Sequence, residues 1–144
     1  MPLITQSDLG THIYAEVLSE IIRNNGSLAD KAIAAAESEA KMYLGRYDLL
    51  ALFGDEHNLP QVQDEFLKHL LKDMACWYII RLANPVIEYK SFREAYDRAI
   101  ATLEKIMEGL ADPAGWPLKE IDTGSIPDGT SVSWSSNPKR NNYY

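Results

Sequence analysis

Apolar residues recur at helical spacing through the first 110 positions of the chain and predict a series of amphipathic helices. The first series, over residues 13–21, repeats at intervals of three and four and stops at the polar residues 24–26. Just before it, Thr5 and Asp8 have the spacing of a helix cap, and Gly10 follows as a break. We therefore expect a short capped turn and then one helix.

A second helix is predicted from Ser27 to about Gly45. Ser27 and Asp30 form an S-x-x-D start, and four alanines within residues 32–36 favour the helix and let a neighbour approach closely. The face expected to be buried consists of Leu28, Ala32, Ala36, Ala40 and Tyr43, with Ile33 and Leu44 beside it. A short apolar patch at residues 49–53 follows.

Two longer helices are predicted next. One runs from Pro60 to Asn84 and is apolar around more than half of its circumference, which is typical of a central helix or of a subunit interface. The other starts at Ser91, where Glu94 would complete a capping box. Its heptad stripe consists of Phe92, Tyr96, Ala99, Leu103, Ile106 and Leu110.

These patterns predict an all-α fold: a small bundle of four to five helices. After residue 110 the composition shifts towards proline, glycine and serine, which favours an extended chain. We therefore divide the protein into a helical body, residues 1–110, and an extended C-terminal arm, residues 111–144. The sequence Pro127-Asp128-Gly129 is suited to the turn of a β-hairpin within that arm.

The charge and composition exclude several classes of function. The formal net charge is −7, which disfavours wrapping DNA or coating an anionic membrane. The longest apolar run, residues 74–80, is far shorter than the roughly 20 residues that a membrane-spanning helix needs. The single cysteine, Cys76, cannot form an internal disulfide and fits a reducing compartment.

No enzymatic motif is recognisable. The chain has no phosphate-binding glycine loop, no G-x-S-x-G and no cysteine pair with metal spacing. His12, His57 and His69 lie far apart in the sequence, and neighbouring carboxylates such as Asp64 and Glu65 suit the first turn of a helix. We therefore expect no catalytic residue, no metal site and no cofactor.

Two regions are candidates for contacts. Arg46, Tyr47 and Asp48 follow the second helix and form either a structural corner or a contact with a neighbouring subunit. The arm is richer in aromatic residues than disordered segments are, so we expect it to dock on another chain; folding back on its own body is the alternative. The candidate docking residues are Trp116, Val132, Trp134, Lys139, Arg140, Tyr143 and Tyr144.

The sequence resembles the Mu-like family of tailed-phage head–tail connector proteins, also called adaptor or head-completion proteins. The resemblance covers roughly residues 3–112. The segments that carry it are Ile4-Thr5-x-x-Asp8-Leu9, Tyr43-Leu44-x-Arg46-Tyr47-Asp48, Leu52-Phe53, Trp77-Tyr78 and Asn84-Pro85.

The resemblance implies a structural virion protein at the head–tail junction, assembled in the host cytoplasm. Such proteins form a ring of about twelve copies, a closed cyclic assembly, beneath the portal protein. The ring extends the DNA channel, through which DNA passes without specific binding, and offers a platform to the next tail or stopper component. The alternative from the residues alone is a monomeric helical module that binds one partner through its C-terminal tail.

Overall fold

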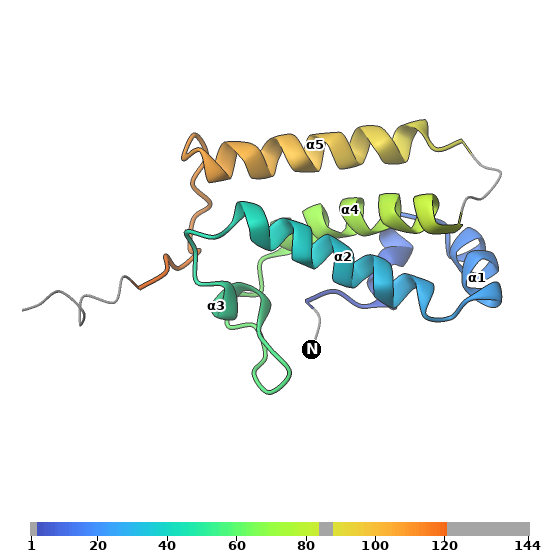
Figure 1. The fold of residues 1–144 in the computed structure, drawn as a ribbon, viewed down its shortest axis with the longest axis horizontal. Helices are drawn as coiled ribbons and strands as arrows, with labels where there is room; N and C mark the ends of the chain where they lie inside the picture. Colours follow the sequence, from blue (N-terminus) through green and yellow to red (C-terminus); the bar gives the residue numbers. More distant parts are fainter. Residues whose placement is uncertain (1–2, 84–87, 121–144) are drawn as a thin grey trace, which may run out of the picture.

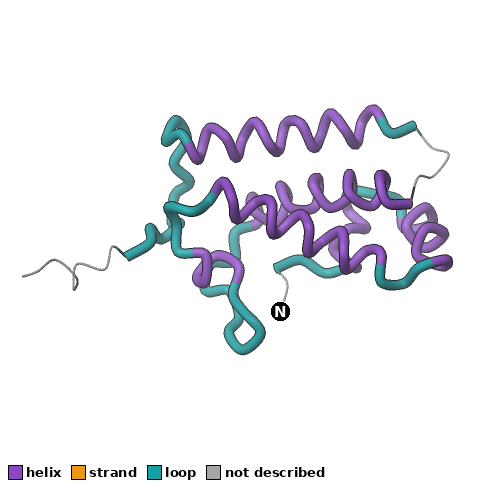
Figure 2. The backbone as a smooth tube through the Cα atoms, viewed as in Figure 1, coloured by secondary structure: helices purple, strands orange, loops and turns teal. Residues whose placement is uncertain are grey.

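The computed structural model of the chain describes residues 3–83 and 88–120, and this part of the protein is helical (Figures 1 and 2). The elements are η1 (Gln6–Thr11), α1 (Ala15–Asn24), α2 (Leu28–Tyr43), α3 (Leu49–Phe53), α4 (Glu65–Ala83) and α5 (Lys90–Met107). Within the described ranges the only β-type pairing is an isolated bridge between Tyr47 and Leu118. The predicted all-α class is confirmed.

Helix α4 is the central element. It lies between α2 and α5, both of which run antiparallel to it, and it also contacts η1 (Figure 1). Its side chains at Leu67, Leu71, Met74, Ala75 and Ile79 are completely covered. The broad apolar arc seen in the sequence thus faces two neighbouring helices at once.

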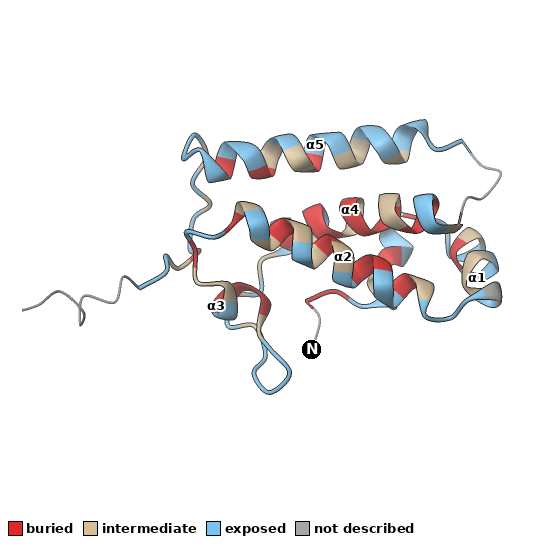
Figure 3. Cartoon of the chain, in the orientation of Figure 1, coloured by how far each residue is buried: buried red, intermediate tan, exposed pale blue. Residues whose placement is uncertain are grey.

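Helix α2 packs closely on α4 through its small residues. Ala32, Ala36 and Ala40 of the predicted face are fully buried, and so is Ala29, which the prediction did not include. Leu28 and Tyr43, predicted on the same face, are half-buried. Helix α5 buries one face only, through Ala99, Leu103 and Ile106, and its outer face is exposed (Figure 3).

The stripe on α5 ends earlier than predicted. The helix stops at Met107, and Gly109 adopts a φ of 79° that turns the chain away. Leu110, expected on the buried face, is therefore 76% exposed.

Of the side-chain caps predicted at the helix starts, only some are present in the structure. The Thr5–Asp8 cap is confirmed, since the Asp8 carboxylate accepts from the Thr5 amide at 2.7 Å. The start predicted at Pro60 is wrong: α4 begins at Glu65, where the Asp64 carboxylate accepts from the amides of the next turn. The Ser27 and Ser91 caps are also wrong, because neither α2 nor α5 has a side-chain cap; Ser27 bonds to Asn25 instead.

No helix in the described ranges is long and apolar enough to cross a membrane. The possible β-hairpin of the arm lies outside the described residues.

Candidate functional site

Arg46, Tyr47 and Asp48 form a corner between α2 and α3. The Tyr47 ring is buried, and its hydroxyl donates a hydrogen bond of 2.8 Å to the Asp112 carboxylate. The Arg46 guanidinium lies 5.1 Å from the centre of that ring and 3.4 Å from Asp112. Asp48 caps α3, since its carboxylate accepts from the amides of Leu50 and Ala51.

The segment after α5, residues 111–119, closes over this corner, and we call it the closing segment. The Asp48 amide donates to the carbonyl of Pro117 at 2.9 Å, and the Lys119 amide donates to the carbonyl of Arg46 at 3.0 Å. These two bonds flank the bridge at Tyr47. The first residues of the arm are thus held by the backbone of the body.

Trp116 anchors the closing segment. Its side chain is only 6% exposed, its ring meets the Tyr47 ring edge-on at 5.5 Å, and its indole N–H donates to the Asp64 carboxylate. Trp116 is therefore packed inside its own chain and is not presented to a partner, contrary to the expectation for this residue. The other candidate docking residues, Val132, Trp134, Lys139, Arg140, Tyr143 and Tyr144, lie outside the described residues.

A second polar cluster joins the three long helices. The carboxylate of Glu39 on α2 accepts hydrogen bonds of 2.7 Å from the hydroxyls of Tyr78 on α4 and Tyr96 on α5. Burial raises the pKa of both phenols, and the hydrogen bonds to the carboxylate raise them further. The Glu39 carboxylate thus links α2 to both α4 and α5.

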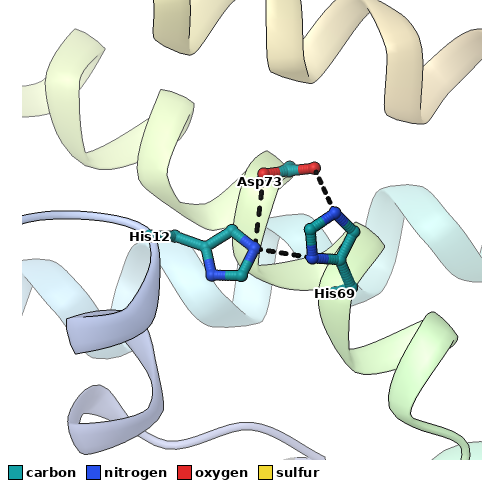
Figure 4. A group of neighbouring side chains, drawn as sticks. All are labelled: His12, His69 and Asp73. Atoms are coloured by element: carbon teal, nitrogen blue, oxygen red, sulfur yellow. Dashed lines mark hydrogen bonds and ion pairs between the residues drawn. The ribbon is translucent and has the colours of Figure 1, made fainter.

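A third cluster brings together two histidines that are far apart in the sequence (Figure 4). His12, at the end of η1, places its Nε2 atom 2.8 Å from Nδ1 of His69 on α4. Both imidazoles face the Asp73 carboxylate, with N–O distances of 3.6 Å from His12 and 3.5 Å from His69. The sequence analysis missed this group; its only local signal is the four-residue spacing that puts His69 and Asp73 on one face of α4.

Burial sets the protonation of this third cluster. It lowers the pKa of His12, although the Asp73 carboxylate opposes that effect. It raises the pKa of Asp73, although both imidazoles oppose it. Two imidazoles and a carboxylate form a set that binds transition-metal cations in proteins, and it is the only such group within the described ranges.

The remaining candidate groups do not join a cluster. His57 is exposed on the loop after α3. Cys76 is buried in α4, as predicted, and burial raises the pKa of its thiol to about 12.

The fold and these clusters define a small, acidic, all-α protein in which buried and half-buried polar groups hold helices together. The chain belongs to the bacteriophage Mu Gp36 family, whose model matches residues 4–115. The predicted resemblance is thereby confirmed, and the protein is a phage protein of the structural or assembly type. Neither a curated protein nor a solved structure matches the chain significantly.

Proposed function

We propose that the protein is a head–tail connector of a Mu-like phage, which forms a ring of about twelve copies under the portal protein and joins head to tail. The observation that carries the proposal is the family match over residues 4–115, which includes all but the first three residues of the helical body and most of the closing segment. In this role the protein extends the DNA channel and needs no catalytic residue and no cofactor. Its place is the head–tail junction of the virion.

The electrostatics support passage of DNA without binding. The net charge of −7 is repeated in every copy of a ring, and an acidic wall repels the phosphates of DNA.

Exposed apolar side chains support contacts at one end of the body. Met42, at the end of α2, is 80% exposed, and Leu50 on α3 is 48% exposed. Leu110 and Leu118, which follow α5, are 76% and 62% exposed. The segments that carry them meet at the α3 end of the body (Figure 1), where a neighbouring subunit or the portal would cover them.

Native mass spectrometry of the chain, alone and mixed with the portal protein of the same genome, tests the proposal. We expect a portal complex that contains about twelve copies of this chain. A chain that stays monomeric and ignores the portal contradicts the proposal and favours the monomeric module with a single partner.

Point variants make the test sharper. Met42→Lys and Leu118→Lys should prevent assembly while the helical circular dichroism is unchanged, because both side chains are exposed in the single chain. Tyr14→Lys is the matched control: Tyr14 is 84% exposed but lies just before α1, away from α3. Equal assembly by all three variants would exclude the α3 end as the contact surface.

The tail needs its own variant. A chain cut after Glu120 keeps Trp116 and the backbone bonds of the closing segment, and it lacks only residues 121–144. We expect this chain to lose portal binding. Full binding by the shortened chain would assign the contact to the body alone.

A further inference from the structure

His12, His69 and Asp73 place their ligand atoms around one small space between η1 and α4. Nδ1 of His12 lies 2.7 Å from the Thr11 hydroxyl, which also donates to the carbonyl of Asp8 at 3.1 Å. The other ring nitrogen, Nε2, faces His69 and Asp73.

The three side chains converge on one another. Nε2 of His12 lies 2.8 Å from Nδ1 of His69, and the Asp73 carboxylate lies 3.6 Å from His12 and 3.5 Å from His69. Each residue offers one ligand atom, and these atoms all lie within 4.8 Å of each other (Figure 4). A single cation placed between them can contact all three residues.

We propose that His12, His69 and Asp73 bind one divalent transition-metal cation of the zinc class. Two imidazole nitrogens and one carboxylate oxygen are a ligand set of zinc sites, whereas calcium and magnesium prefer oxygen ligands alone. Zinc–nitrogen bonds of about 2.0–2.1 Å require the two nitrogens to separate from 2.8 Å to roughly 3.3 Å. His69 can make this shift because its side chain is 56% exposed.

The surroundings of His12 suit a metal ligand. The bond to Thr11 orients the His12 ring from behind, as outer partners of metal-binding histidines do.

The site would join two parts of the fold. His12 ends η1, while His69 and Asp73 lie on the central helix α4, so the metal ties the N-terminal turn to the core of the body. A fourth coordination position remains for water. His12 and Asp73 also line a cavity of about 640 Å³ that extends towards Phe92 on α5, so this position is reachable from solvent. The proposal does not depend on the connector role.

Isothermal titration of the full-length chain with ZnCl₂ at pH 7 tests the proposal. We expect one zinc ion per chain. His69→Gln and Asp73→Asn should each weaken the affinity by on the order of 100-fold, and Thr11→Val by about tenfold. His57→Gln, at an exposed histidine outside the cluster, is the matched control and should bind as the wild type does.

Two further readouts make the result decisive. Circular dichroism should be unchanged in His69→Gln. CoCl₂ should give the visible bands of a four-coordinate ion with the wild type and with His57→Gln but not with His69→Gln. Equal zinc affinity in His69→Gln and His57→Gln would overturn the proposal. So would histidine NMR signals that move with pH but not with zinc, since the cluster would then bind only a proton.

Discussion

The hydroxyl of Tyr47 donates a 2.8 Å hydrogen bond to Asp112, which lies 65 positions later in the chain. This contact joins the end of α2 to the first residues after α5. Together with the two backbone bonds of the closing segment, it makes residues 111–119 part of the body rather than part of a free arm.

Tyr47→Phe should lower the free energy of unfolding by about 1 kcal/mol, because the buried ring stays and only the hydrogen bond is lost. The loss is modest since the Asp112 side chain is 71% exposed and regains water. Urea unfolding measures it. Tyr14→Phe, at an exposed ring, is the control and should change nothing.

Removing the closing segment should destabilise the body. Trp116→Ala removes a buried indole and should cost about 3–5 kcal/mol. A chain cut after Leu110 should lose at least as much, which lowers Tm by about 10–20 °C, whereas a chain cut after Glu120 should keep the wild-type Tm. Thermal circular dichroism compares the three. Equal Tm values for both truncations would contradict the anchoring role of Trp116.

Glu39→Gln should destabilise the junction of the three long helices by about 1–2 kcal/mol, because an amide replaces a charged acceptor shared by two hydroxyls. A cycle with Tyr96→Phe, measured by urea unfolding, should show that the two changes are not additive. Glu94→Gln, on the exposed face of α5, is the matched control. Strict additivity would mean that the hydroxyl and the carboxylate do not interact.

The protein should lose stability at alkaline pH partly through Tyr96. Burial and the Glu39 carboxylate raise the pKa of this phenol above its ordinary value of 10.0. A raised pKa contributes stability that is fully present below the unfolded value and is lost as the pH rises towards the folded one. Urea unfolding between about pH 10 and 12 should therefore show a steeper decline for the wild type than for Tyr96→Phe.

Cys76 should be unreactive in the folded protein. The thiol is buried and its pKa is about 12, so thiolate is scarce and reagent has no access at pH 8. Labelling with a thiol reagent should be at least about 100-fold faster in urea than in buffer. Fast labelling of the native chain would contradict the burial of this residue.

The sequence was most informative where burial follows helical spacing. The alanine face of α2 and the apolar arc of α4 could be predicted because each position on an ideal helix has a fixed direction. The start of α4 could not, because Pro60 is compatible with a first helical position while the actual cap is the Asp64 side chain.

The candidate sites were predictable only in part. Arg46, Tyr47 and Asp48 could be identified as candidates because they follow a helix. The contact of Arg46 and Tyr47 with Asp112 could not be predicted, because it forms only when distant parts of the chain fold together. His12 and His69 are separated by 57 positions, so no local sequence pattern predicts their contact. The prediction that Trp116 makes a packing contact was correct. Composition, however, cannot distinguish a tryptophan that packs on its own chain from one that packs on a partner.

The central place of α4 has a consequence for how the body opens. Because η1, α2 and α5 all rest on this one helix, none can separate without uncovering its apolar surface. The body should therefore unfold as a single cooperative unit, with the amides of α4 the last to exchange their hydrogens. A force applied to one of the long helices is therefore distributed over the whole helical body. The protein enters an assembly as one rigid unit.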